Sequence, residues 1–341
     1  MSPGQELLAG GEDRLPFANG APGPRIRGSP RFDFVAPHRP ERSKMSLAME
    51  PPTKNHALST RRSFLAAAGA AATFALLPRV TARAASSIPV GLEMYSVRNT
   101  MAKDLNGTVR AVATAGYQGL EFYAPYYEWT TNQAKEMRRL LDDLGIRCFS
   151  THNDSDYFDP QKLFHTRELN LILGSKYVVM ASSHEDSGAG GWKQVAETLN
   201  QSAHLLGTDG LKVGYHNHQT EFRRGPDGLR PMDILASNTD PSVMLQLDVG
   251  TCIEAGSDPV AWIKANPGRI RSMHCKEWSP DPAKGYSVLF GEGVAPWKQL
   301  FETAEHGGGI EYYLVEQEGS RFSEIETAQK CLSSFRATHG A

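Results

Sequence analysis

Two stretches of the chain, Leu211-Lys-Val-Gly-Tyr-His-Asn-His218 and Val243-Met-Leu-Gln-Leu-Asp-Val-Gly250, share one pattern. Each begins with a short apolar run of the length of a β-strand and ends in polar residues of the types that bind metals or transfer protons. Between such runs the apolar residues change to helical spacing, as in Ala134, Met137 and Leu141. Strands that alternate with helices form parallel βαβ units, so these stretches indicate an α/β protein.

The same pattern occurs eight times from Ile88 onward. Eight βα units within about 255 residues match the size of a (β/α)8 TIM barrel, which we predict for residues 86–341. The alternative is a doubly wound open sheet, but that fold usually has fewer strands and a glycine-rich first turn, and no G-x-G-x-x-G follows the first strand. The predicted strands are Pro89–Tyr95, Gly119–Tyr123, Ile146–Ser150, Lys176–Met180, Leu211–Tyr215, Val243–Leu247, Ile270–Met273 and Tyr312–Val315.

The first 84 residues differ from the rest in composition. Residues 1–58 hold nine of the 21 prolines and show neither helical nor strand periodicity. We therefore expect no packed core there and interpret this part as a disordered or mis-annotated extension, with Met45 or Met49 as an alternative start.

Residues 59–84 have the three parts of an export signal. Arg61-Arg62 precedes an apolar, uncharged run from Phe64 to Leu77, and Ala82-Arg83-Ala84 follows it. A twin arginine, a short apolar run and a small-x-small site predict a twin-arginine signal peptide and a periplasmic or exported protein. The alternative is an amphipathic helix of the domain itself. A run of about 14 residues is too short to span a bilayer, so we expect no stable membrane insertion after cleavage.

Composition and charge exclude several classes of protein. With 40% apolar and 22% charged residues, the chain is neither a multi-span membrane protein nor wholly disordered. Residues 1–84 hold 12 of the 36 basic and 6 of the 38 acidic residues, so the remainder has a formal net charge of −8. An acidic domain without a basic stripe disfavours nucleic acid as a partner. The four cysteines form no Cys-x-x-Cys pair, and we expect four buried free thiols.

Four consecutive strands end in histidine or carboxylate residues. His216 and His218 follow the fifth strand, Asp248 the sixth, His274 the seventh and Glu316 the eighth. In a TIM barrel these ends lie together at the face that carries the active site. One such residue alone is more often a turn or cap residue, whereas four on adjacent strands predict a divalent metal centre, for Mn²⁺, Zn²⁺, Fe²⁺, Co²⁺ or Mg²⁺.

These motifs resemble those of the sugar phosphate isomerase/epimerase family of xylose isomerase-like barrels, which is related to inosose dehydratases and ketohexose epimerases. The resemblance covers Val90–Val97, Tyr-His-Asn-His, Leu-Asp-Val-Gly, His-Cys-Lys-Glu, Phe290–Trp297 and Val-Glu-Gln-Glu. The family holds its metal with Glu, Asp, His and Glu on strands 5 to 8. It implies that Asp248, His274 and Glu316 are ligands here. The strand 5 carboxylate is missing, and we assign its place to His216, with His218 or Glu221 as alternatives.

The shared chemistry of such sites is removal of a proton next to a carbonyl group. We expect Glu316 to act as both ligand and base, and His218 as a second base or acid. Lys276, two residues beyond His274, is expected to stabilise a developing oxyanion or to protonate a leaving group; a solvated lysine is the alternative. The predicted substrate contacts are Glu121, His152, Asn153, Glu221 and Trp278.

The sequence therefore predicts an exported, metal-dependent isomerase or epimerase of a free sugar, keto-sugar or cyclitol. Its partner is a small-molecule sugar, and homo-oligomerisation stays open. One alternative on the same scaffold is a lyase or dehydratase that acts on keto-sugars or glycosides. Others are a non-catalytic sugar-binding protein and an apurinic-site endonuclease, which the charge of −8 disfavours.

Overall fold

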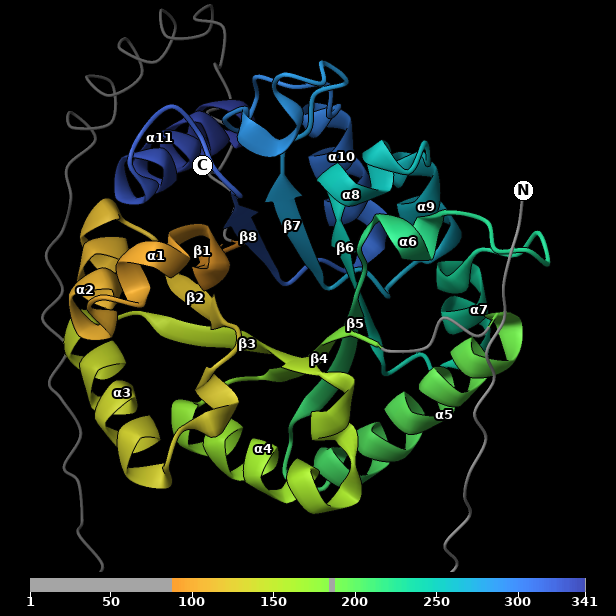
Figure 1. The fold of residues 1–341 in the computed structure, drawn as a ribbon, viewed down its shortest axis with the longest axis horizontal. Coiled ribbons are helices and arrows are strands. Elements are labelled where there is room, and N and C mark those ends of the chain that lie inside the picture. The colour runs from red at the N-terminus through yellow and green to blue at the C-terminus, as the bar shows by residue number, and fades with distance from the viewer. Residues whose placement is uncertain (1–87, 184–187, 341) are drawn as a thin grey trace, which may run out of the picture. The chain divides into compact units, whose positions relative to one another are not determined.

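A computed structural model describes residues 88–183 and 188–340. The predicted extension, 1–58, and the predicted signal peptide, 59–84, lie outside the described residues. Eight parallel strands follow one another around a closed barrel, and β8 pairs with β1 (Figure 1). This confirms the predicted (β/α)8 barrel. The strands are β1 Val90–Glu93, β2 Gly119–Phe122, β3 Arg147–Asp154, β4 Tyr177–Ser182, β5 Lys212–His216, β6 Met244–Asp248, β7 Ser272–Lys276 and β8 Tyr312–Glu316.

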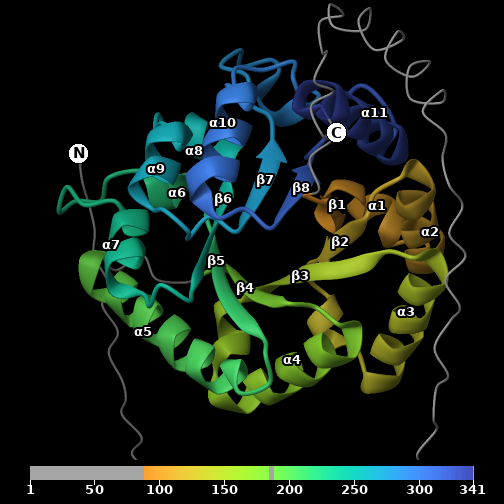
Figure 2. The same cartoon turned by 180° about the vertical axis from the view of Figure 1, so that it is seen from behind.

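Helices cover the outside of the barrel, as both views show (Figures 1 and 2). Their ends follow ordinary capping rules. Helix α3, for example, begins with a capping box between Thr130 and Gln133 and ends at Gly145, whose φ of 67° suits glycine. The helices are α1 Arg98–Met101, α2 Leu105–Ala115, α3 Thr131–Leu144, α4 Pro160–Leu173, α5 Gly188–Gly207, α6 Gln219–Phe222, α7 Pro231–Asn238, α8 Val249–Glu254, α9 Pro259–Ala265, α10 Trp297–Thr303 and α11 Glu324–His339.

The barrel interior has an apolar part and a polar part. Large side chains fill the amino-terminal half, and Gly91 and Gly119 leave room there for the ring of Phe149. The apolar group consists of Phe149, Tyr177, Val179, Met244, Tyr312 and Leu314. It closes the barrel from below, so the polar residues near the carboxyl ends of the strands face a pocket with a solid floor.

Most strands end later than predicted, and β3 and β7 run furthest beyond the predicted ends. β3 continues to Asp154 and β7 to Lys276, so His152 and His274 lie within strands and not in the loops after them. The extension of β3 pairs with β4 and that of β7 pairs with β8. Polar residues can prolong these strands because other polar groups inside the barrel satisfy their side chains.

The state of the cysteines agrees with the sequence-based expectation. All four cysteines are buried and free, as predicted. None of the helices in the described part of the chain combines the length and the apolarity that crossing a bilayer requires.

Candidate metal and substrate site

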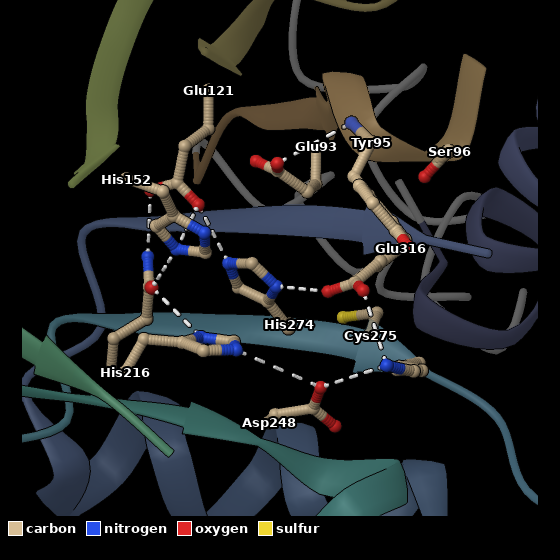
Figure 3. A network of polar contacts seen from close by, with 12 residues as sticks. Glu93, Tyr95, Ser96, Glu121, His152, His216, Asp248, His274, Cys275 and Glu316 are labelled. Atoms are coloured by element: carbon tan, nitrogen blue, oxygen red, sulfur yellow. Dashed lines mark hydrogen bonds and ion pairs between the residues drawn. The ribbon is translucent and has the colours of Figure 1, made fainter. Parts of the chain in front are cut away.

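Four side chains from adjacent strands meet at the carboxyl end of the barrel (Figure 3). His216 ends β5, Asp248 ends β6, His274 lies in β7 and Glu316 ends β8. One possible ligand atom from each residue lies within 4.8 Å of those of the other three, and all four residues are buried. We call these residues the β5–β8 cluster.

One oxygen of Asp248 is available to a ligand. Its Oδ1 accepts a hydrogen bond from the backbone N–H of Thr251 at 3.0 Å, which fixes the carboxylate. Its Oδ2 is buried and accepts no hydrogen bond from the described residues. Nζ of Lys276 lies 3.5 Å and Nε2 of His216 4.0 Å from this oxygen, so within the described part of the chain only these two ion-pair contacts approach it. Two imidazoles and two carboxylates form a donor set that Zn²⁺, Mn²⁺, Fe²⁺ and Co²⁺ accept, so the cluster fits a divalent metal.

Contacts with Gln246 and Glu121 fix which ring nitrogen of His216 and of His274 faces the cluster. Nδ1 of His216 lies 3.0 Å from the amide Oε1 of Gln246, which can only accept, so Nδ1 carries the proton and Nε2 faces Asp248. Nε2 of His274 lies 2.8 Å from Oε1 of Glu121, and its Nδ1 lies 2.5 Å from Oε2 of Glu316. Partners of this kind behind a histidine are typical of metal sites, where they orient the ring.

The two histidines carry different charges. Burial lowers the pKa of His216 well below its ordinary value, and the neighbouring His274 adds to this, so the His216 imidazole is neutral. Burial also lowers the pKa of His274, but Glu121 and Glu316 outweigh it and raise that pKa well above its ordinary value. A histidine binds metal through a ring nitrogen that carries no proton, so a metal bound at Nδ1 of His274 would replace one proton, while Nε2 would still donate to Glu121.

Lys276 is a buried positive charge beside the cluster. Its Nζ lies 3.1 Å from Oε1 of Glu316 and 3.5 Å from Oδ2 of Asp248, and it also donates to Glu318. Burial lowers the pKa of Lys276, but Glu316 and the other two carboxylates raise it well above its ordinary value. The ammonium group is therefore charged and held in place from several sides.

An open pocket of about 450 Å³ lies over the cluster. His216, Glu316 and Lys276 line it, and so does His218, whose ring centroid lies 5.0 Å from that of His216. Tyr95 is also part of its wall. The volume is in the range that binds a small organic molecule, and polar groups that converge below it are typical of a catalytic pocket.

Residues 109–337 match the model of the xylose isomerase-like TIM barrel family. The chain belongs to this family.

The chain is similar to an inosose dehydratase of Clostridium botulinum (strain Alaska E43 / Type E3), with 27% identical residues over 209 positions. The matched region covers 54% of this chain and 68% of that protein. A sugar phosphate isomerase/epimerase from Parabacteroides distasonis ATCC 8503 has a similar solved structure, with a TM-score of 0.63, 24% identity and coverage of 74% of this chain and 96% of that one. The structure of the protein IOLI, which contains a zinc atom, gives a TM-score of 0.59 at 14% identity, covering 74% of this chain and 98% of that one. At these identities the two solved structures show a common fold.

Most of the predicted site residues of this xylose isomerase-like chain lie together. The four residues assigned as ligands form the β5–β8 cluster. His218 and Lys276 line the pocket above it, as do His152 and Asn153. The predicted substrate contact of Asn153 competes with hydrogen bonds inside the protein, because its Nδ2 already donates to the backbone oxygens of Thr151 and Val179.

Three predicted substrate contacts lie elsewhere. Glu121 is fully buried below the pocket, where its Oε1 lies 2.8 Å from Nε2 of His274 and 2.9 Å from Nε2 of His152. Glu221 accepts hydrogen bonds from the hydroxyl of Tyr215 at 2.9 Å and from the backbone N–H of His218 at 2.8 Å, so its carboxylate caps α6. Trp278 is not among the residues that line the pocket. The sequence alone does not reveal that other groups of the protein already donate hydrogen bonds to a carboxylate.

Two residues of the site escaped the sequence analysis. Gln246 contacts His216 and also lies 2.8 Å from Nε2 of His152, while its own Nε2 donates to Glu121 at 2.9 Å. Glu93 is buried and lines the pocket. Both are single polar residues inside apolar runs, at positions that alternate with outward-facing ones. That signal could have identified them, because a polar side chain in a strand that is buried on both faces requires hydrogen-bond partners inside the protein or on a ligand.

Proposed function

We propose that this protein is a divalent-metal-dependent enzyme that removes a proton next to the carbonyl group of a keto-sugar, free sugar or cyclitol. The observation that carries the proposal is the buried β5–β8 cluster, in which one oxygen of Asp248 accepts no hydrogen bond from the described residues, beside an open pocket. Similarity to inosose dehydratases and to a sugar phosphate isomerase/epimerase supports a polyhydroxylated substrate. The zinc atom in IOLI supports a metal of this kind.

Different residues of the site carry out different parts of this reaction. A divalent ion held by the β5–β8 cluster would polarise the substrate carbonyl as a Lewis acid. Burial raises the pKa of Glu316, but Lys276 and His274 hold it well below its ordinary value, so this carboxylate is ionised and can accept a proton. The charge of Lys276, 3.1 Å from Glu316, stabilises the negative charge that develops on the substrate oxygen. His218, which also lines the pocket, provides the second group that exchanges a proton.

Isomerisation or epimerisation is the first candidate outcome, and elimination of water is the second. Lys276 is compatible with elimination, because its ammonium group, 3.1 Å from Glu316, can donate a hydrogen bond to a departing hydroxyl and stabilise the negative charge on it. The similarity to inosose dehydratases points the same way. After proton removal the two reactions differ only in whether the proton returns to carbon or a hydroxyl leaves.

The test combines metal analysis with turnover in D₂O. We expect about one divalent ion per chain and conversion of an inosose or a 3-keto-hexose. Deuterium on one carbon without a change in formula means isomerisation or epimerisation, and loss of water means a dehydratase. Glu316→Gln should lower kcat by about 10²- to 10⁴-fold, the usual contribution of a general base. Glu311→Gln is the matched control, since Glu311 pairs with Lys176 and Lys212 before the start of β8.

Two results would refute this proposal. One is a purified protein that binds no divalent ion and keeps its activity with a chelator. The other is a Glu316→Gln variant as active as the Glu311→Gln control. Ligand-induced thermal stabilisation without conversion of any sugar would instead favour a sugar-binding protein.

Export is a separate part of the proposal. Arg61-Arg62, the apolar run after it and Ala82-Arg83-Ala84 support a twin-arginine signal. Expression with Arg61→Lys and Arg62→Lys together should leave the protein in the cytoplasm, whereas wild type should reach the periplasm with an N-terminus near Ala85. Equal cytoplasmic retention of both would contradict export.

A further inference from the structure

The pocket has carboxyl groups outside the β5–β8 cluster, and that of Glu93 is the most deeply buried of them. Glu93 ends β1 and lines the pocket, although its exposed fraction is only 1%. The backbone N–H of Tyr95 approaches its Oε1 at 3.4 Å, which is long for a hydrogen bond (Figure 3). Its Oε2 receives no hydrogen bond from any described residue. The protein therefore leaves one buried oxygen of Glu93 without a donor.

The neighbours of Glu93 cannot supply that donor. Glu121 lies opposite Glu93 in the register of β1 and β2, and Glu316 lies on β8, the other neighbour of β1. Both carboxylates only accept hydrogen bonds when ionised. A sugar hydroxyl can donate, so it can supply the hydrogen bond that the described residues do not give to Oε2 of Glu93.

A second metal ion fits this place less well. Ligand atoms of Glu93, Glu121, His152 and His274 lie within 4.8 Å of one another. However, Oε1 of Glu121 already contacts Nε2 of His152 at 2.9 Å and Nε2 of His274 at 2.8 Å, and its Oε2 accepts from Gln246 at 2.9 Å. Among these four described residues, Glu93 alone has an oxygen without a donor. One oxygen suits a hydroxyl group and is too few for a second cation.

Two tyrosines border the same side of the pocket. The rings of Tyr95 and Tyr123 meet edge to face with their centroids 5.2 Å apart, and both residues line the pocket with Glu93. A carboxyl group beside aromatic rings can bind a polyhydroxylated ring, because the carboxyl group hydrogen-bonds to a hydroxyl group and the aromatic rings pack against the C–H groups.

We propose that Glu93 is a further substrate-contacting residue, whose Oε2 receives a hydrogen bond from a ring hydroxyl of the substrate. The inference rests on the proposed function. It narrows the substrate class to ring compounds that have a free hydroxyl group where the bound substrate meets Glu93. A site built to bind a hydroxyl rejects the analogue that lacks it, since the buried partner then stays unpaired. Glu93 therefore determines specificity among sugars and cyclitols.

Binding measurements on the full-length, metal-loaded protein test the proposal. The probes are an inosose, a 3-keto-hexose and the monodeoxy analogues of the inosose, measured by calorimetry. Glu93→Leu should weaken binding of the inosose by about 10- to 100-fold, and Glu93→Gln, which keeps a hydrogen-bonding group, by less. One monodeoxy analogue should bind wild type and Glu93→Leu equally. Metal content should stay at the wild-type value, and Glu311→Gln should bind every probe as wild type does.

The outcomes separate this inference from the proposed function. Equal inosose affinity of wild type and Glu93→Leu would overturn the role of Glu93 and leave the proposed function standing. A fall in metal content in both Glu93 variants would make Glu93 a metal ligand and overturn the inference. Failure of wild type to bind any probe would refute the proposed function and this inference with it. If Glu93→Leu does not fold, Glu93→Gln decides: an unchanged preference for the inosose over every monodeoxy analogue contradicts the proposal.

Discussion

Gln246 joins three charged or titratable side chains below the pocket. Its Oε1 contacts Nδ1 of His216 at 3.0 Å and Nε2 of His152 at 2.8 Å, and its Nε2 donates to Glu121 at 2.9 Å. A side chain with both an acceptor and a donor is needed here, because a carboxylate would repel Glu121 and an ammonium group could not accept the hydrogen bond from Nδ1 of His216. Gln246 thus keeps the proton on Nδ1 of His216 and leaves Nε2 to face Asp248.

We predict that Gln246→Met weakens the affinity for the divalent metal by about 10- to 100-fold, the usual effect of removing a partner behind a metal-binding histidine. The methionine fills a similar volume, so the barrel should stay folded. Competition with a chelating dye measures the affinity. Gln201→Met, at an exposed position of α5 where Gln201 contacts only Glu197 at 3.3 Å among the described hydrogen bonds, is the control. Equal metal affinities of the two variants would show that Gln246 does not orient His216.

The residues of the β5–β8 cluster could be predicted because they end apolar runs, where a polar residue is conspicuous. Glu121 and Glu221 were predicted to face the substrate on the same grounds, yet protein groups take up their oxygens. Whether a carboxylate serves the ligand or the protein depends on donors that are distant in sequence. Glu121 and His274, for example, are separated by 153 positions. Spacing along the chain contains no information about such pairs.

At the scale of elements, an irregularity in β3 supports the floor of the site. The register between β2 and β3 shifts between Leu120 and Glu121, so Leu120 pairs with Cys148 and Glu121 pairs with Ser150. Phe149 is the extra residue of this bulge and belongs to the apolar group inside the barrel. The alternating pattern of an ideal strand would not predict this orientation, and the sequence analysis accordingly did not anticipate the bulge or the continuation of β3 to Asp154.

We predict that Gly119→Ala destabilises the protein by about 1–3 kcal/mol, the usual result of overfilling a packed interior. A Cβ at Gly119 would lie 2.5–2.7 Å from three ring carbons of Phe149, so the ring would have to move. Urea unfolding measures the change. Gly207→Ala in α5 is the control, because a Cβ there meets nothing within 4 Å, and alanine favours a helix over glycine by up to about 1 kcal/mol. If both variants have the same stability, Phe149 does not depend on the space that Gly119 leaves.

For the whole barrel, the first and last βα units must meet to complete the ring. β1 pairs with β8 through Val90 and Tyr313, and outside the barrel α1 lies next to α11 (Figures 1 and 2). Glu324, in the first turn of α11, links these two helices: its carboxylate accepts hydrogen bonds from the backbone N–H groups of Asn99 and Thr100 at 3.2 and 2.8 Å. The sequence predicted the ring from eight strands, but could not predict this contact between residues 225 positions apart.

The contact that Glu324 makes between α1 and α11 depends on pH. Burial raises the pKa of Glu324, but the hydrogen bonds from Thr100 and Asn99 outweigh it and lower the pKa below its ordinary value near 4.5. A carboxyl group whose pKa is lower in the folded than in the unfolded state stabilises the protein above its unfolded pKa. This stabilisation is lost as the pH falls through the folded pKa. The contact should therefore contribute fully at neutral pH and disappear in strong acid.

We predict that Glu324→Gln lowers the free energy of unfolding by about 1 kcal/mol at pH 7, comparable to the loss of a helix cap. The difference from wild type should shrink as the pH falls below about 4, because protonated Glu324 and glutamine are then alike in charge. Urea unfolding at several pH values measures it. Glu326→Gln on the same helix is the control, since Glu326 is exposed and pairs with Lys330 at 3.6 Å. A Glu324→Gln deficit that is the same at every pH would mean that shape, and not charge, holds α1 to α11.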